Sequence, residues 1–184
     1  MNLREHYARA TTFAQFLDGA QAHAQLWRDI SARAAVPAAM VERAREVGAP
    51  RRLLVLLEDW CGDAINTVPY LAALAEAVPG LELRVLRRDE HPALMDAHLS
   101  PTGGRAIPVV IVLDADYEEL GWWGSRPAEL QQWATSPEAR AMDAKDRYRV
   151  VRTWYARDRG RTTMREVLDL LGAPAEAGAP AAVG

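Results

Sequence analysis

Hydrophobic positions along the first fifty residues predict two helices. From Thr12 to about Ala34, apolar side chains recur at intervals of three and four residues, and Thr12 and Gln15 have the spacing of a helix capping box. A second, shorter helix is predicted from Pro37, which suits a first helical turn, to Gly48, which suits a helix end. Two helices are therefore expected before the first strand.

The next elements alternate between buried strands and helices. Residues 51–58 contain an uninterrupted apolar run at 53–57, which predicts a strand buried on both faces. A helix is predicted from Cys61 to Val78, because its apolar side chains recur at helical spacing and Pro79-Gly80 ends the pattern. A second strand at 81–86 completes a β-α-β unit, and a short helix is predicted at 91–99.

The remaining pattern predicts a hairpin and further helices. Residues 109–113 form a buried strand, and residues 117–122 can pair back on it across an acidic turn. Three helices follow: one that begins at 124–127 and runs through Trp133, one from Ser136 to Arg159, and one from Thr163 to Gly172. Thr163 and Glu166 have the spacing of a second capping box.

Composition narrows the class of protein. The chain has 184 residues, of which 49% are hydrophobic, so it is expected to form one globular domain. A net charge of -3 gives no basic footprint for nucleic acid. The first residues lack the apolar stretch of a secretory signal and no apolar run is long enough to cross a bilayer, so we expect a cytoplasmic protein without a membrane partner.

Two charged or small-residue segments are interpreted as surface features. The arginines between 147 and 161 alternate with Asp146 and Asp158, which favours a solvated helix face over a binding patch. Residues 173–184 are rich in alanine, proline and glycine, which is typical of a disordered tail.

Cys61 is the one cysteine in the chain, so neither an internal disulfide nor a zinc site built on paired cysteines can form. The histidines are scattered, and no metal site is expected. Because Cys61 is predicted at a helix start, backbone N–H groups and the helix dipole favour its thiolate. Nearby carboxylates at Asp63, Glu58 and Asp59 oppose that effect. We predict a moderately depressed pKa for Cys61, with Glu58 or Asp59 as candidate proton acceptors.

The sequence Trp60-Cys61-Gly62-Asp63-Ala64 resembles the Trp-Cys-Gly-Pro-Cys motif of the thioredoxin superfamily. Pro69 stands where thioredoxins have a helix-kinking proline, Ile107-Pro108 precedes a buried strand, and the order of elements agrees. The resemblance implies an α/β, thioredoxin-like fold with a mixed central sheet of about four strands flanked by helices. Residues 1–172 would form one domain, with a helical extension at 1–49, the core at 50–135 and C-terminal helices at 136–172. These helical extensions resemble those of a bacterial group of uncharacterised thioredoxin-like proteins.

The resemblance also implies a site. In the superfamily the proline at the position of Pro108 is cis and faces the active-site cysteine, so Cys61 would be the nucleophile and the Ile107 backbone would pair with substrate. The implied substrate-binding residues are Trp60, Gly62, Asp63, Ile107, Pro108 and Gly124. One of Trp122 and Trp123 is expected to point outward as a further substrate contact, whereas Trp27, Trp133 and Trp154 are expected in the core.

Departures from the motif limit the implied chemistry. Ala64 replaces the second cysteine and Val55 stands where thioredoxins have a buried acid, so a dithiol mechanism cannot run. The pattern C-G-x-A resembles that of monothiol glutaredoxins, which implies a monothiol thiol-disulfide oxidoreductase with a low-molecular-weight thiol or an external cysteine as resolver. Its partners would be a thiol- or disulfide-bearing protein or a small thiol, with no bound cofactor.

Two other functions remain open from the sequence, so whether the protein is an enzyme also remains open. The first is a redox-inactive thioredoxin-fold module that binds a peptide or partner in the same groove. The second is a dimer that shares an iron–sulfur cluster through Cys61 and a small thiol.

Overall fold

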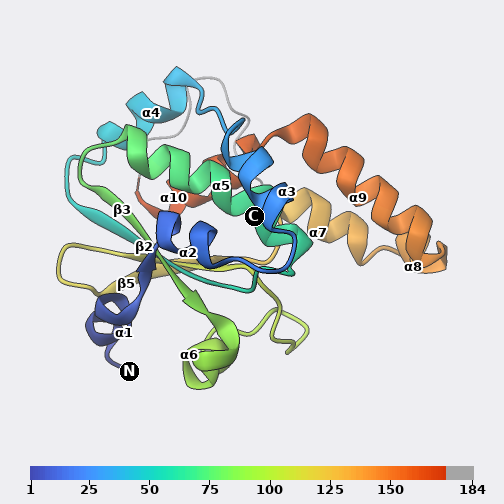
Figure 1. The fold of residues 1–184 in the computed structure, drawn as a ribbon, viewed down its shortest axis with the longest axis horizontal. Helices are drawn as coiled ribbons and strands as arrows, with labels where there is room; N and C mark the ends of the chain where they lie inside the picture. Colours follow the sequence, from blue (N-terminus) through green and yellow to red (C-terminus); the bar gives the residue numbers. More distant parts are fainter. Residues whose placement is uncertain (173–184) are drawn as a thin grey trace.

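A computed structural model, described for residues 1–172, contains a five-stranded mixed sheet with helices on both faces (Figure 1). The strand order is β1-β3-β2-β4-β5. The strands are β1 (Thr11–Thr12), β2 (Arg51–Leu57), β3 (Leu81–Arg87), β4 (Val109–Leu113) and β5 (Glu119–Gly124). The expected α/β fold is confirmed, with β1 added at the edge of the four expected strands.

The two central strands carry the core. Val55 of β2 pairs with Val85 of β3 in parallel and with Val110 of β4 in antiparallel register. Every residue of β4 is buried, because helices cover both faces of the sheet, and this explains its uninterrupted apolar sequence. At the end of β5, Gly124 pairs with Val109, so this end of the hairpin lies beside the start of β4.

Helices connect and cover the strands. The crossover helix α5 (Gly62–Ala77) joins β2 to β3. The other helices are α1 (Leu3–Arg9), α2 (Phe13–Gly19), α3 (Ala24–Ser31), α4 (Ala38–Arg45), α6 (Pro92–Asp96), α7 (Ala128–Ala134), α8 (Pro137–Ala141), α9 (Ala144–Asp158) and α10 (Arg161–Leu170), and Arg88–Glu90 forms a 3-10 turn. In Figure 1, α7, α8 and α9 form an arm that projects from the main body.

The N-terminal prediction of two helices is wrong, since four helices and a short strand precede β2. The predicted helix from Thr12 is interrupted because His23 has a left-handed backbone, with φ of 54°, immediately before α3. Its predicted capping box, between Thr12 and Gln15, is present. Helix α1 was not predicted because it buries one side chain only, Tyr7, and therefore has no apolar stripe.

The C-terminal boundaries also differ. The predicted helix from Ser136 to Arg159 is two helices, because Asp143 caps a new one by accepting a hydrogen bond from the Asp146 N–H at 2.8 Å. The predicted capping box at Thr163 is wrong, since α10 starts after Gly160 and Thr163 is buried. The predicted tail at 173–184 lies outside the described residues. No helix among the described residues is long and apolar enough to span a membrane.

Of the three tryptophans expected in the core, Trp27 alone is fully buried. Trp133 and Trp154 are half-buried on the projecting arm. Helical spacing placed them on an apolar stripe, but the arm meets the rest of the protein over only part of its surface.

Candidate functional site

Cys61 caps the start of α5, directly after β2. Its Sγ accepts a hydrogen bond from the Ala64 N–H at 3.4 Å and donates one to the Ile107 carbonyl oxygen at 3.4 Å. The Ile107–Pro108 peptide bond is cis, as the resemblance implies. The structure therefore brings Cys61, Ile107 and Pro108 together at one end of the sheet.

Burial dominates the electrostatics of this cysteine. Cys61 is 7% exposed, and this burial raises the pKa of its thiol above the ordinary value. The Asp63 carboxylate adds to the increase, whereas backbone N–H groups at Ala64 and Asp63 and the Arg126 guanidinium lower it. The prediction of a depressed pKa is wrong, because desolvation of the sulfur outweighs the helix start.

We expect the alkylation rate of Cys61 by iodoacetamide to increase with pH and reach half its plateau above about pH 8.5, the midpoint for an unperturbed thiol. The thiolate is the reactive form, so a raised pKa leaves less of it at neutral pH. Mass spectrometry of quenched samples measures the rate, with Cys61→Ser as the unreactive control. A midpoint below that of free cysteine would contradict this expectation.

Asp63 joins three parts of the site. One carboxylate oxygen accepts a hydrogen bond from the Tyr155 hydroxyl at 2.8 Å, and the other lies 2.7 Å from the Arg126 guanidinium. Burial and the Asp63 carboxylate both raise the pKa of Tyr155. Burial alone would lower the pKa of Arg126, but the Asp63 carboxylate raises it above the ordinary value. Sequence reasoning missed Arg126 and Tyr155 because they come from the loop after β5 and from α9. Nothing in the sequence marks either residue as part of the site, except that Arg126 is two residues from Gly124.

Gly124 allows the end of β5 to approach the cis-proline segment. A Cβ added there would lie 2.5 Å from the Pro108 carbonyl oxygen. The next peptide bond, Gly124–Ser125, is also cis. Gly124 therefore lies at the site, as the resemblance implies, with its role set by close backbone packing.

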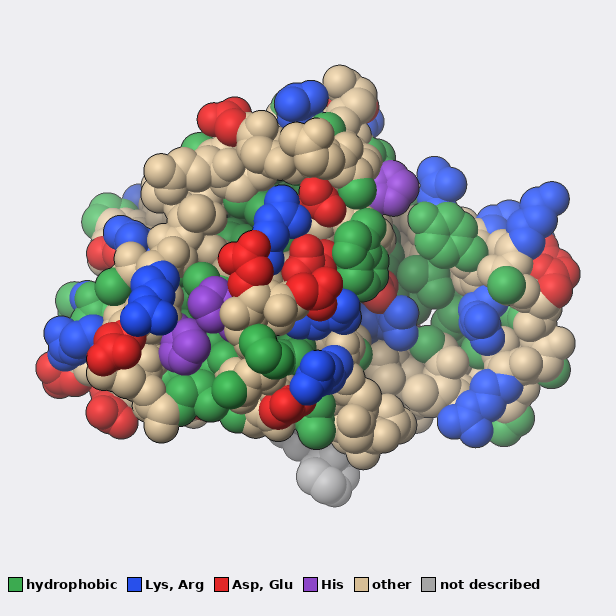
Figure 2. All heavy atoms as spheres, turned by 60° about the horizontal axis from the view of Figure 1, so that its bottom comes forward, with side chains coloured by type: hydrophobic (Ala, Val, Ile, Leu, Met, Phe, Trp, Pro, Cys, Tyr) green, Lys and Arg blue, Asp and Glu red, His purple; other side chains and the backbone are tan. Residues whose placement is uncertain are grey.

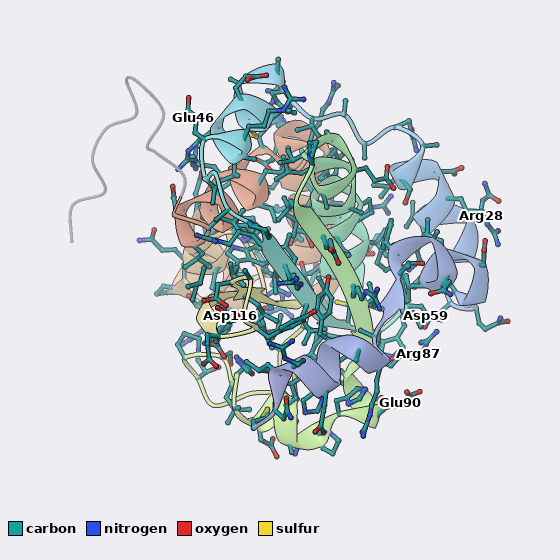
Figure 3. All side chains as sticks on the ribbon, turned by 90° about the vertical axis from the view of Figure 1, so that its left-hand side faces the viewer. Arg28, Glu46, Asp59, Arg87, Glu90 and Asp116 are labelled. Carbon is teal, nitrogen blue, oxygen red and sulfur yellow. The ribbon has the colours of Figure 1, made fainter. Side chains whose placement is uncertain are left out.

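The candidate proton acceptors are engaged elsewhere. The carboxylate of Glu58 accepts hydrogen bonds from the Asp89 N–H at 3.0 Å and from Arg87 at 3.2 Å. Asp59 lies beside Arg87 (Figure 3), and its carboxylate accepts a hydrogen bond from the Gln21 N–H at 2.9 Å. Burial alone would raise the pKa of Asp59, but the Gln21 and Ala22 N–H groups and Arg87 lower it. The structure therefore does not support Glu58 or Asp59 as acceptors of the Cys61 proton.

Of the three tryptophans near the site, Trp60 is exposed, Trp122 is half-buried and Trp123 is buried. Trp60 is 49% exposed, and the Arg88 guanidinium lies 5.2 Å from its ring centre. Trp122 and Trp123 face opposite sides of β5 as predicted, but Trp122 packs edge-on against His98. Trp123 is buried and donates a hydrogen bond to Glu166 at 2.6 Å. Trp122 is half-buried, so the expectation that one of this pair contacts substrate stays a prediction.

A cleft of about 880 Å³ adjoins Trp60 and Gly62, on the side that faces α3 and α9. It is the recess in Figure 2 between the main body and the projecting arm. A second cavity of about 410 Å³ adjoins Gly62 and Asp63 and extends toward α9. Within residues 1–172, no group of three His, Cys, Asp or Glu side chains is arranged to hold a metal ion. The two cavities therefore adjoin the sequence neighbours of Cys61.

Comparisons with known proteins agree with this architecture. A family model described as thioredoxin matches residues 10–145. A search of curated proteins gave no match. A protein of unknown function from Pseudomonas aeruginosa is 22% identical, with a TM-score of 0.72 over 94% of this chain and 98% of that one. An HIV epitope scaffold is 20% identical, with a TM-score of 0.72 over 95% and 100%. The two structures show the fold alone, and the family match shows that the chain belongs to the thioredoxin superfamily.

Proposed function

We propose that the protein is a monothiol thiol-disulfide oxidoreductase that acts through Cys61. The proposal rests on the placement of Sγ at the first turn of α5, 3.4 Å from the carbonyl oxygen that precedes cis-Pro108. An extended chain docked along Ile107 and Pro108 would bring a disulfide to this sulfur. Gly124 leaves room for this segment because it has no side chain.

The reaction is a thiol–disulfide exchange. The Cys61 thiolate attacks one sulfur of a substrate disulfide, a new S–S bond forms, and the other substrate sulfur leaves as a thiolate. Ala64 cannot resolve the mixed disulfide, so an external thiolate attacks the substrate-derived sulfur. That attack forms a disulfide between substrate and external thiol and releases the Cys61 thiolate. The protein returns to its starting state after each cycle.

Mass spectrometry tests the proposal directly. Incubation with a small disulfide at pH 8.5 should add the mass of one half of that disulfide to the wild-type chain, and a second thiol should remove it. Cys61→Ser should gain no mass under the same conditions. A wild-type chain that stays unmodified, while unfolded wild-type chain reacts, would exclude the proposed chemistry.

Asp63→Asn is expected to make Cys61 react about threefold to tenfold faster at pH 7, since one pKa unit changes the thiolate fraction tenfold. The substitution removes a carboxylate that raises the pKa of the thiol and leaves Arg126, which lowers it. The rates of wild type and variant should converge at high pH, where both thiols are ionised. Asp146→Asn, which changes a half-exposed carboxylate near the start of α9, is the matched control. A slower reaction at every pH would show that Asp63 activates the thiol instead.

A second candidate function is a redox-inactive binding module. The burial of Cys61 and its raised pKa favour this function, because both reduce attack by the thiolate at neutral pH. The adduct experiment separates the two candidates, since a binding module would hold a partner in the groove without forming a disulfide.

A further inference from the structure

One face of α9 forms a wall of the 880 Å³ cleft. Tyr148, Arg152 and Tyr155 recur every three or four residues, which places them along one side of the helix, and Arg159, at its C-cap, lines the same cleft. The opposite wall comes from α3 and the residues that flank it, and the exposed ring of Trp60 adjoins both. The cleft is therefore lined by aromatic rings, and its cations come from segments outside the β-α-β unit.

The charge of this cleft has one sign. Its lining includes His23, Arg33, Arg152 and Arg159 but no aspartate or glutamate. In the part of the chain that the structure describes, none of these three arginines has a carboxylate within 4.0 Å. A cleft lined by unneutralised cations raises the local concentration of anions.

The neighbouring cavity continues the pattern toward Asp63 and Arg126. It shares Tyr148, Arg152 and Tyr155 with the larger cleft and adds Arg126 and Arg147 to the lining. Its one acidic residue, Asp63, is already paired with Arg126. The Arg126 Nε is buried and has no hydrogen-bond partner within the described residues. Both cavities adjoin Gly62, the residue next to Cys61.

The arginines of α9 thus differ from the solvated face expected from the sequence. Arg147, Arg152 and Arg159 line the two cavities, whereas Arg149 forms an ion pair with Asp146 and Arg157 lies on the other side of the helix. The sequence did not show which arginines line the cavities, because residues three or four apart share a helix face whereas adjacent residues do not.

We infer that this cleft binds a small anionic thiol or its disulfide. This molecule would be the external thiol that the proposed function requires, so the inference rests on that function. Guanidinium groups pair with carboxylates or phosphates, and aromatic rings hold the rest of such a molecule. A volume of about 880 Å³ is within the range of small-molecule sites. Trp60 and Gly62, which flank Cys61 in the sequence, both line this cleft.

Calorimetry on Cys61→Ser tests binding without the chemistry. Glutathione disulfide supplies carboxylates, coenzyme A disulfide supplies phosphates, and cystamine supplies a cationic disulfide as the control probe. We expect at least one anionic probe to bind more weakly as salt increases and cystamine not to bind. The anionic probe that binds identifies the charged group.

Paired variants locate the site. The first variant combines Arg33→Ser with Arg152→Ser in the Cys61→Ser background. It should weaken binding of the anionic probe about tenfold or more, since each of the two arginine substitutions removes one charged contact. Arg149→Ser with Arg157→Ser removes the same charge from the other side of α9 and should leave binding unchanged. Equal effects of the two pairs, binding of cystamine, or no binding of either anionic probe would overturn the inference. If the anionic probe binds but wild-type Cys61 forms no adduct, the proposed exchange reaction is excluded and the binding inference stands.

Discussion

Trp27→Ala is expected to lower the free energy of unfolding by about 3–5 kcal/mol, the usual cost of truncating a large buried aromatic side chain. Trp27 is fully buried and packs edge-on against Phe13 and Phe16. Its indole Nε1 donates a hydrogen bond to the Asp59 carbonyl oxygen at 2.8 Å, two residues before Cys61. The variant loses both the packing and this bond, so α3 loses its anchor to the site.

Urea unfolding followed by circular dichroism measures this loss. Trp60→Ala is the matched control, because Trp60 is half exposed and lies next to the same cysteine; we expect it to cost under about 1 kcal/mol. Trp27→Phe keeps the ring volume in part and removes the hydrogen bond, so it should lie between the two. Similar losses for Trp27→Ala and Trp60→Ala would contradict the packing described here.

The sheet could be predicted from sequence because its signal is local. The predicted strand at 109–113 has the bounds of β4, since strands buried on both faces need continuous apolar residues. The helix breaks could not be predicted, because they depend on single backbone conformations such as the left-handed His23. A two-residue edge strand such as β1 has no hydrophobic period and is recognised by its pairing with β3.

The site was predicted where motif and position coincide, at Cys61 and Pro108. The direction of the Cys61 pKa shift was predicted wrongly, because helix-start effects can be inferred from sequence but burial of Sγ depends on the surrounding fold. Arg126 and Tyr155 lie more than sixty residues along the chain from Asp63, so their contacts with it leave no local pattern. Arg33 and Arg152, which line one cleft, are also far apart along the chain.

Gly124→Ala is expected to lower the free energy of unfolding by about 1–3 kcal/mol, the usual cost of forcing an extra carbon into a packed site. The added Cβ would lie 2.5 Å from the Pro108 carbonyl oxygen, and a backbone atom cannot rotate away as a side chain can. Gly124 is not among the residues with positive φ, so the clash and not the backbone conformation causes the loss.

The same substitution should also change the thiol. Moving Pro108 moves the Ile107 carbonyl away from Sγ and admits water, so the alkylation midpoint of Cys61 should fall toward the ordinary value near about 8.5. Gly19→Ala is the control, since its added Cβ meets no atom within 4 Å; it should not lower the free energy of unfolding and should leave the midpoint unchanged. A destabilised Gly124→Ala protein with an unchanged midpoint would mean that the cis-proline segment does not control access to the sulfur.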